Sequence, residues 1–387
     1  MEQRILVVGG GIGGLVLARA LAQQGVAVDL IERAPALRAL GAGITLGANA
    51  MRALGAIGRA DAVAARGRVM VSGAIASRDG KTLSCTRFDA LAPRHGDAHA
   101  IHRGALHEAL VADLEAAVNV RCGTTLSALN DLGDAGVEVQ LSTGASARYR
   151  AVIGADGLRS AVRTMVFGAN EPTYAGYTCW RWTGLVPGGT PAMVEQWGRG
   201  ARVGLVPLGR DEVYAFFVAD APRGTPADPA EARVERVRAR FADFGGEVPR
   251  VLAAMPDGEA LLHHDIEEVE QSPWCRGSVA LLGDAAHAMT PNFGQGAAMA
   301  IEDAVVLARE LVAHREAPAA LRAYEARRRP RVEEIQRGAR RFGAIGQWRS
   351  PLATWARDLA VRLTPESTTQ RALERIVGYG LALSERL

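Results

Sequence analysis

"RILVVGGGIGGLVLARALAQQGVAVDLIER", residues 4–33, carries the clearest structural signal in the chain. Residues 5–8 form a continuous aliphatic run, as expected of a strand that is buried on both faces. A GxGxxG pattern follows at once, a helical pattern covers 15–24, Gly25 ends it, and 26–31 form a second apolar run. The segment therefore predicts the strand, helix and strand of a parallel α/β sheet.

The glycine pattern has a specific use at a strand–helix junction. Gly9 permits the tight turn, Gly11 lets the backbone approach a pyrophosphate, and Gly14 lets helix and strand pack closely. The free N–H groups and the dipole at the helix start favour phosphate. Glu32 closes the second strand 18 residues after Gly14 and can accept hydrogen bonds from ribose hydroxyls. We infer a bound adenine dinucleotide, and both NAD and FAD satisfy this segment. The predicted dinucleotide site is Gly9, Gly11, Gly13, Gly14, Glu32 and Arg33.

Two later stretches bear on the choice between these dinucleotides. In "YRAVIGADGLRSAVR" (149–163), residues 151–154 read as a strand and Asp156-Gly157 as a turn before a helix. In "VALLGDAAHAMTPNFGQGAAMAIEDA" (279–304), a strand over 279–282 stops at Gly283-Asp284. A carboxylate at the carboxyl end of a parallel strand lies where open α/β sheets bind ligands. A single aspartate there is explained as a helix cap. The GxGxxG, GADG and GD motifs together, in this order, favour a bound dinucleotide over a helix cap.

The chain resembles the single-component FAD-dependent monooxygenases, the aromatic-hydroxylase family with the p-hydroxybenzoate hydroxylase fold. The resemblance spans nearly the whole chain. It implies FAD, NAD(P)H as the reduced nicotinamide donor, dioxygen, and oxygen transfer through a flavin C4a-hydroperoxide. It therefore predicts an enzyme that hydroxylates a small aromatic or N-heterocyclic substrate. The residues that carry it are 9–14 with Glu32, "GAGITLGANAMRALG" (41–55), "IHRGALHEAL" (101–110), "GADGLRSAVR" (154–163) and "GDAAHAMTPNFGQGAAMAIEDA" (283–304).

The resemblance also implies contacts to FAD. Asp284 is expected to accept hydrogen bonds from the ribityl hydroxyls. Arg103 is expected to reach the pyrophosphate and ribityl region, where its bidentate fork suits phosphate. Leu126 lies in a strand that meets the adenine through its backbone in the family. Asp156 belongs to a motif that is associated there with both FAD and the nicotinamide donor.

The glycines after Asp284 are expected to border the flavin ring. Pro291 stops an early helix, and Gly294 and Gly296 allow backbone N–H groups to approach the isoalloxazine edge. A helix is predicted from about Ala297 to residue 314. Its positive end would favour the anionic reduced flavin.

Segments without dinucleotide motifs read as a second domain. Strand-rich hairpins are predicted around Arg78–Gly80, which supplies Asp-Gly turn chemistry, and around 208–212. We therefore predict an α/β fold with a Rossmann-like FAD-binding domain, a mainly antiparallel β-sheet substrate domain and a C-terminal helical tail interrupted at Pro351 and Pro365. The predicted ranges are 1–68, 94–170 and 275–330 for the first, 69–93 and 171–274 for the second, and 331–387 for the tail.

Arg202 and Tyr214 are the candidate catalytic residues. The stretch "GRGARVGLVPLG" around Arg202 resembles the family branch that includes FAD-dependent urate hydroxylases and zeaxanthin epoxidases. In the urate enzymes an arginine in a similar setting contacts the substrate. The alternative for Arg202 is an ordinary strand arginine that points to solvent. Tyr214 in "EVYAFF" is carried over in the same way. "YAGYTCWRWTG" adds Arg181, between Trp180 and Trp182, as another polar group on an apolar sheet.

Composition argues against several other classes of protein. The net charge of +3 over 387 residues does not indicate binding to nucleic acid. The four cysteines form no CxxC pair and the histidines no HExxH, so we expect neither a metal site nor a disulfide framework, and a cytoplasmic location. The sequence contains no run of 18 apolar residues, so we expect no transmembrane helix. A monomer and a homodimer are equally consistent with the sequence.

Three alternative functions remain open. A simple NAD-dependent dehydrogenase explains 9–32 but leaves the two later motifs without a role. A family member that binds FAD without oxygenase activity would have identical cofactor motifs. An epoxidase of a larger lipophilic substrate requires a broad pocket or a membrane-facing helix in the tail, for which an ordinary solvated helix is the alternative. The tail arginines that lie among apolar residues are Arg340, Arg341, Arg349, Arg357 and Arg362.

Overall fold

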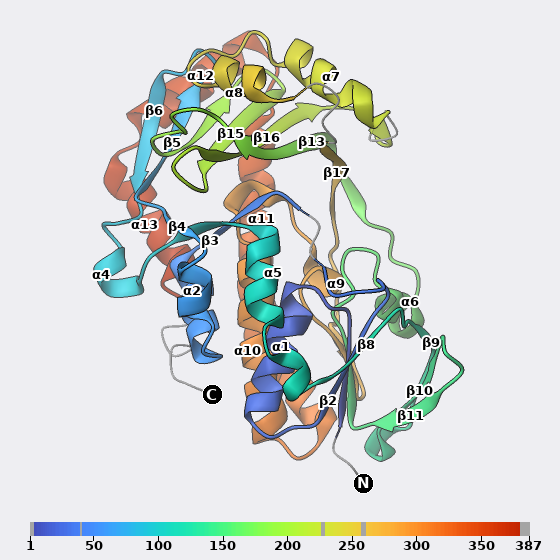
Figure 1. The fold of residues 1–387 in the computed structure, drawn as a ribbon. Helices are drawn as coiled ribbons and strands as arrows, with labels where there is room; N and C mark the ends of the chain where they lie inside the picture. Colours follow the sequence, from blue (N-terminus) through green and yellow to red (C-terminus); the bar gives the residue numbers. More distant parts are fainter. Residues whose placement is uncertain (1–3, 39–40, 226–228, 257–260, 380–387) are drawn as a thin grey trace.

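Two β-sheets set the architecture of the chain (Figure 1). The computed structural model describes residues 4–38, 41–225, 229–256 and 261–379. Within these residues one six-stranded sheet has the order β18-β19-β12-β1-β2-β8, and one seven-stranded sheet has the order β17-β13-β16-β15-β14-β5-β6. Figure 1 shows the two sheets in opposite halves of the molecule. The predicted α/β fold with a second, mainly antiparallel sheet and C-terminal helices is confirmed.

The six-stranded sheet brings the predicted dinucleotide motifs to one edge. β1 (Ile5–Val8), β2 (Val28–Glu32), β8 (Asn119–Cys122), β12 (Ala151–Gly154) and β19 (Val279–Leu281) are parallel, and β18 (Cys275–Arg276) is an antiparallel edge strand. Val8 pairs with Gly154, which pairs with Leu281. The motifs that follow these three strands therefore meet at the carboxyl edge, as the sequence predicts.

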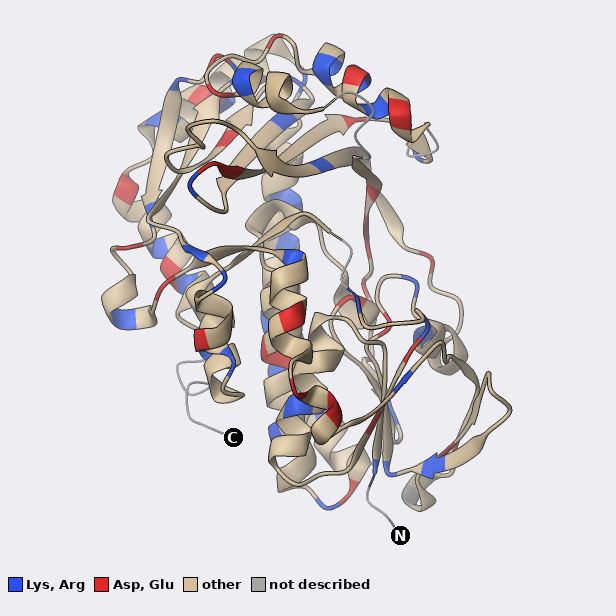
Figure 2. Cartoon of the chain, viewed as in Figure 1, with Lys and Arg blue, Asp and Glu red and all other residues tan. Residues whose placement is uncertain are grey.

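Close packing at the first turn explains the glycine pattern. α1 spans Ile12–Gln23, starting three residues earlier than the predicted helix. A side chain at Gly14 would place its Cβ 2.0 Å from the carbonyl oxygen of Gly9, whose own φ is +111°. All four residues of β1 and ten of α1 are buried. Most of this sheet is tan in Figure 2, so few of its residues are charged.

The seven-stranded sheet forms the second half of the fold. It consists of β5 (Ser72–Ser77), β6 (Thr82–Arg87), β13 (Thr173–Leu185), β14 (Met193–Trp197), β15 (Ala201–Pro207), β16 (Glu212–Asp220) and β17 (Leu262–Glu268). All its pairs are antiparallel except β14 with β5. The predicted hairpins at 78–80 and 208–212 are both present. α7 (Arg233–Arg240) and α8 (Val248–Ala254) pack their buried valines into the core of this sheet, and Figure 2 shows charges of both signs along α7.

The C-terminal helices link the two halves. α10 (Gly296–Ala313) packs on α1 and on α11 (Ala317–Gly346). α12 (Pro351–Leu363) and α13 (Glu366–Val377) follow, so the predicted interruptions at Pro351 and Pro365 match the helix boundaries. α11 begins at Ala317 and continues through Pro330, so the predicted domain limit at 330/331 lies inside a helix. The domain ranges themselves remain a prediction.

Shorter elements complete the described chain. They are β3 (Gly43–Leu46), α2 (Ala48–Ala56), α3 (Ala60–Ala64), β4 (Arg68–Val69), α4 (Ala92–His95), β7 (His99–His102), α5 (Arg103–Val111), η1 (Leu114–Ala116), β9 (Leu126–Asp131), η2 (Gly133–Ala135), β10 (Val137–Leu141), β11 (Ser146–Tyr149), α6 (Ala161–Phe167), η4 (Ala230–Ala232), α9 (Asp284–His287) and η5 (Pro291–Phe293). β9, β10 and β11 form one small sheet, and β3, β7 and β4 form another.

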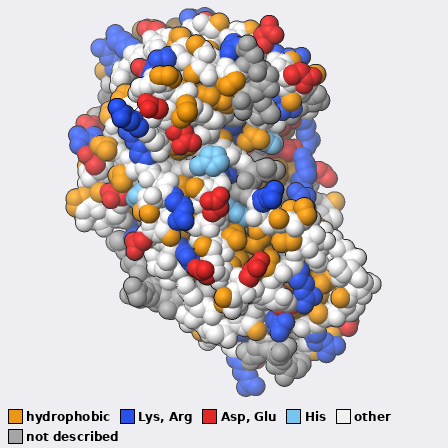
Figure 3. All heavy atoms as spheres, viewed as in Figure 1, with side chains coloured by type: hydrophobic (Ala, Val, Ile, Leu, Met, Phe, Trp, Pro, Cys, Tyr) orange, Lys and Arg blue, Asp and Glu red, His pale blue; other side chains and the backbone are white. Residues whose placement is uncertain are grey.

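The surface shows charges of both signs. On the face in Figure 3, basic and acidic side chains are interspersed with apolar ones. In the part of the chain that the structure describes, no helix is long and apolar enough to cross a membrane. The same residues contain no group of three or more His, Cys, Asp or Glu side chains arranged to hold a metal ion. All four cysteines are free thiols.

Candidate active site

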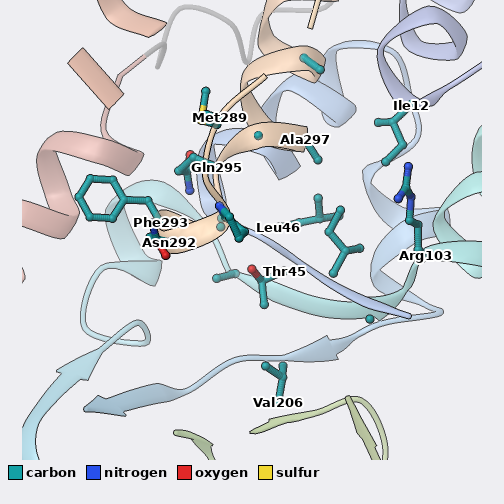
Figure 4. Close-up of a pocket in the computed structure, with 18 of the residues that line it drawn as sticks. Ile12, Thr45, Leu46, Arg103, Val206, Met289, Asn292, Phe293, Gln295 and Ala297 are labelled. Carbon is teal, nitrogen blue, oxygen red and sulfur yellow. The ribbon is translucent and has the colours of Figure 1, made fainter. Parts of the chain in front are cut away.

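One large cavity lies between the two sheets (Figure 4). Its volume is about 500 Å³. On one side it is bordered by the turns at the carboxyl edge of the six-stranded sheet, with Gly11, Gly13 and Asp284. On the other side it is bordered by the seven-stranded sheet, with Arg202 and Tyr214. The cavity therefore joins the predicted cofactor residues to the predicted substrate residues.

The start of α1 has the features of a pyrophosphate site. The N-cap, Gly11, offers no side-chain cap, and the first turn contains no acidic residue. A Cβ at Gly11 would meet no atom within 4 Å, so its backbone is open to the cavity. Glu32 holds the glycine turn in place, because its carboxylate accepts hydrogen bonds from Gly10 N at 2.7 Å and Ala34 N at 2.8 Å. Free helix N–H groups and an open glycine fit a phosphate group.

The start of α10 offers a second open helix end. Gly294 has φ of +61°, the left-handed region that favours glycine, and Pro291 begins η5. Gln295 is the N-cap without a side-chain hydrogen bond to the helix, and Gly296 and Ala297 border the cavity. Figure 4 shows Gln295 and Ala297 around this helix end. The helix begins one residue before the prediction and presents its positive end to the cavity, which fits an anionic ring edge.

Arg103 lies at the first position of α5 and points into the cavity. Its buried Nε has no hydrogen-bond partner within the described residues. Burial lowers the pKa of this guanidinium, while the carboxylate of Asp284 opposes that shift. Gly41 leaves room for it, because a Cβ there would lie 2.6 Å from Arg103 Cδ. An enclosed cation with an unpaired donor fits a diphosphate or a polyol, so these residues match the predicted FAD.

Six of the predicted cofactor residues do not border this cavity: Gly9, Gly14, Glu32, Arg33, Leu126 and Asp156. Gly9 and Gly14 face each other within the strand–helix turn. Glu32 supports the glycine turn, and Arg33 is exposed. Leu126 is buried in the core of the first half. Asp156 caps α6, because its carboxylate accepts hydrogen bonds from Ser160 Oγ at 2.5 Å and from the backbone N–H groups of 161 and 162. Direct contacts of these six residues with FAD remain predictions.

We expect FAD to be held without a covalent bond. Among the described residues that border the cavity, the one thiol is Cys179 and there is no histidine. Burial raises the pKa of the Cys179 thiol, which keeps it protonated and unreactive. Acid precipitation should therefore release all flavin into the supernatant, measured by its visible absorbance. A yellow pellet after washing would contradict this expectation.

Strand alternation turns a polar set of side chains toward the cavity. On β13, Cys179 and Arg181 border the cavity, whereas Trp180 and Trp182 are buried against the α7 and α8 side. Because successive strand residues point to opposite faces, the same division recurs on the neighbouring strands. The cavity-facing residues there are Met193 and Glu195 on β14, Arg202 and Val206 on β15, and Tyr214, Phe216 and Val218 on β16.

Arg181 and Tyr214 are neighbouring polar side chains that border the cavity, and each affects the pKa of the other. Burial opposes the charge of Arg181, but the neighbouring Cys179 and Tyr214 raise its pKa overall. Burial raises the pKa of Tyr214, and Arg181 counteracts that shift. Arg181 is therefore a cation and Tyr214 a neutral hydroxyl at pH 7. The tyrosine ring packs on β3, since a Cβ at Gly43 would lie 2.5 Å from it.

Arg202 is buried and tied to three protein groups. It is 1% exposed, which excludes the solvated alternative. Nη1 donates to Glu195 Oε1 at 2.8 Å, Nε to Gln347 Oε1 at 2.9 Å and Nη2 to Asn292 Oδ1 at 2.9 Å. A guanidinium has five donors, so each terminal nitrogen keeps one N–H beyond these bonds. Arg202 borders the cavity, so these groups can serve a bound ring.

Apolar side chains from outside the seven-stranded sheet also border the cavity. Leu91 and Val377 belong to one small buried cluster, and Leu373 of α13 packs against it. All three border the cavity. Three further apolar side chains border the cavity: Met193 from β14, Met70 from the segment before β5, and Phe88 from the segment after β6. The cavity therefore combines cationic side chains of the seven-stranded sheet, here called its cationic end, with the cluster of Leu91, Leu373 and Val377, here called its apolar end.

Sequence reasoning missed several cavity residues. Gln295 borders the cavity, and its Oε1 accepts a hydrogen bond from Asn49 Nδ2 at 3.0 Å. Asn292 and Glu195 were not singled out because each acts through Arg202, which requires long-range contacts. Arg181, in contrast, is predicted from the sequence as a polar group on an apolar sheet, and it borders the cavity.

Comparisons with known proteins agree with this geometry. A family model described as "FAD binding domain" matches residues 2–339. The chain is 40% identical over 363 residues to an aurachin C monooxygenase/isomerase of Stigmatella aurantiaca, with 93% of this chain and 94% of that protein covered. It is 36% identical to a 2-heptyl-3-hydroxy-4(1H)-quinolone synthase of Pseudomonas aeruginosa, covering 96% and 97%. Klebsiella pneumoniae HpxO, solved with FAD and uric acid, superposes with a TM-score of 0.89 at 29% identity, covering 98% of both chains.

Proposed function

Because this chain belongs to the family of FAD-dependent monooxygenases, we propose that it hydroxylates an N-heteroaromatic ring that carries an apolar substituent. The chain is a flavin-dependent monooxygenase, and FAD is its cofactor. NAD(P)H is the donor typical of the family's hydroxylases. The proposal concerns the substrate, for which the fold alone is no guide.

The two-part cavity is the observation that carries the proposal. Its cationic end, with Arg181, Arg202 and the Tyr214 hydroxyl, suits a ring with carbonyl or ionised oxygen groups. Its apolar end, at Leu91, Leu373 and the residues around them, suits an alkyl or similar chain. One substrate with both features would fill both ends.

The relatives support a ring of this kind. The Pseudomonas aeruginosa relative is named for a 4-quinolone with a 2-heptyl chain and a 3-hydroxyl group. HpxO was solved with uric acid, another N-heterocycle. We extend the first pattern to this chain, because uric acid has no chain that would use the apolar end of the cavity.

The protein groups supply binding, orientation and exclusion of water. Reduced FAD held by these residues would supply the two electrons that activate dioxygen, one oxygen atom of which goes to the ring and the other to water. Arg181 and Arg202 stabilise negative charge on the ring oxygen, which makes the ring more electron-rich. The Tyr214 hydroxyl, neutral at pH 7, can donate a hydrogen bond to the same oxygen. The apolar side chains that border the cavity help to keep water from the reacting atoms.

A substrate comparison tests this proposal. NAD(P)H oxidation should be stimulated more by 2-heptyl-4-quinolone than by 4-quinolone without the chain, and more than by urate, with one added oxygen in the product by mass. Stronger stimulation by urate would assign the chain a urate-type substrate. If none of the three compounds stimulated oxidation, the proposed substrate class would be wrong.

Arg181→Gln should weaken substrate binding while leaving FAD content unchanged. Loss of a charge-assisted hydrogen bond costs about 1.5–3 kcal/mol, or roughly a 10- to 150-fold rise in KM. Arg210→Gln is the matched control, because Arg210 is exposed in the turn between β15 and β16. An unchanged KM in Arg181→Gln, measured with the best substrate, would remove Arg181 from the ring site.

A further inference from the structure

The helix α12 presents apolar side chains to solvent. Leu352, Trp355 and Leu363 are 74%, 62% and 71% exposed, and Leu359 is exposed as well. Their spacing of three, four and four residues places them on one face of the helix. Trp348 and Ile345, at the end of α11, are exposed just before this face. We call these six residues the α12 face.

Polar contacts fix this orientation of α12. Arg357 points inward, where Nη1 donates to Gly346 O at 3.1 Å and Nη2 to Gly198 O at 3.2 Å. Its guanidinium also lies 5.2 Å from the centre of the Trp197 ring. Thr354 is buried on the same side. The helix is therefore inverted relative to an ordinary surface helix, with Arg357 inside and its leucines outside.

The sequence around the α12 face is rich in arginine, since residues 335–363 contain six arginines and a single acid, Asp358. Four of the six arginines pair with acids: Arg337 with Glu333, Arg340 with Glu268 and Glu270, Arg349 with Asp220, and Arg357 with Asp358. Arg341 and Arg362 are exposed and have no acidic partner among the described residues, and Arg362 lies in the last turn of α12. An apolar stripe with tryptophan and flanking arginines matches a helix that lies in the surface of an anionic bilayer.

We propose that the α12 face docks on the surface of an anionic lipid bilayer. Leu352, Trp355, Leu359 and Leu363 enter the acyl boundary, while Arg341 and Arg362 contact the lipid phosphates. This is a surface contact, and it agrees with the absence of a spanning helix in the described residues. An exposed apolar area of this kind requires a partner, and the surrounding positive charge favours anionic lipid over a second copy of the same positively charged face.

The position of α12 gives the contact a consequence for the cavity. α12 and α13 both pack against β6, at the left of Figure 1. α13 supplies Leu373 and Val377 to the apolar end of the cavity. Docking would therefore bring the apolar end of the cavity close to the lipid, where a compound with an alkyl chain partitions. The docking itself does not depend on the proposed substrate.

Vesicle co-sedimentation of the full-length, FAD-loaded protein tests the proposal. The protein should bind phosphatidylcholine vesicles that contain phosphatidylglycerol, and bind at least tenfold more weakly to phosphatidylcholine alone, since each arginine near an anionic surface contributes roughly a fivefold factor. Leu352→Ser combined with Trp355→Ser should lose at least tenfold in affinity, because burial of even one such side chain changes an equilibrium by roughly tenfold. Arg341→Gln combined with Arg362→Gln should lose about 25-fold on the anionic vesicles only.

A matched control and two contrary outcomes make the test decisive. Leu185→Ser combined with Val71→Ser removes exposed apolar side chains elsewhere and should leave binding unchanged. FAD content of every variant reports whether it is folded. No binding to anionic vesicles, or equal binding by all variants, would overturn the proposal. A concentration-dependent dimer that Trp355→Ser dissociates, without vesicle binding, would assign the α12 face to a second copy instead.

Discussion

Arg202→Ala is expected to lower the free energy of unfolding by about 3–5 kcal/mol, the cost of breaking a buried ion pair from one side. The side chains of Arg202 and Glu195 are 2% and 10% exposed, and their charged atoms lie 2.8 Å apart. The substitution leaves a buried carboxylate without its cation. Trp197 Nε1, which donates to Glu195 Oε1 at 3.0 Å, remains as a partner and favours the lower end of the range. Urea unfolding with FAD bound measures the effect.

A double substitution separates stability from substrate binding. Arg202→Met combined with Glu195→Gln removes both charges, so it should recover much of the stability lost in Arg202→Ala. Substrate KM should stay raised in the double variant, and more hydrogen peroxide should be released per NAD(P)H oxidised, because an ill-held ring misses the transferred oxygen. Recovery of both stability and normal coupling would show that Arg202 serves the fold alone.

Asp284→Ala is expected to lose FAD with little effect on the fold. A carboxylate that accepts hydrogen bonds from ligand hydroxyls contributes about 1.5–3 kcal/mol, or roughly 10- to 150-fold in affinity. Asp284 lies at the first position of the short helix α9 and borders the cavity, so its removal disturbs little packing. Titration of the apoprotein with FAD, followed by flavin fluorescence, gives the affinity.

Two further variants serve as references for the FAD affinity of Asp284→Ala. Asp284→Asn keeps one carbonyl acceptor and should lose less affinity than Asp284→Ala. Asp61→Ala removes an exposed acid in α3, away from the cavity, and should bind FAD like the parent. Equal FAD affinity in Asp284→Ala and the parent would mean that the carboxylate does not contact the cofactor.

Local patterns predict the cofactor half well. The β1 and β12 strands end where the apolar runs end, and the parallel register brings their glycine and aspartate motifs to one edge. Gly9 and Gly14 lie too close together for a side chain at Gly14, and because they are near in sequence a local motif is enough to predict this contact. Helix α10 also begins within one residue of the prediction.

Long-range contacts limit prediction of the rest. Arg202 is buried because Glu195, Gln347 and Asn292 reach it from three separate segments, and no local pattern encodes that meeting. α11 continues through Pro330 because its packing on α10 outweighs the missing backbone donor. The apolar stripe on α12 resembles a core-facing pattern, yet the inward contacts of Arg357 turn it to solvent.

Oxygen-isotope labelling tests the central claim most directly. The protein should be supplied with FAD, NAD(P)H, 2-heptyl-4-quinolone and ¹⁸O₂, and the product analysed by mass spectrometry. A monooxygenase acting on a ring in this cavity should incorporate one labelled oxygen atom into the ring for each NAD(P)H consumed. Unlabelled product, or NAD(P)H consumption that yields only hydrogen peroxide with this and every other heterocycle supplied, would contradict the proposed function.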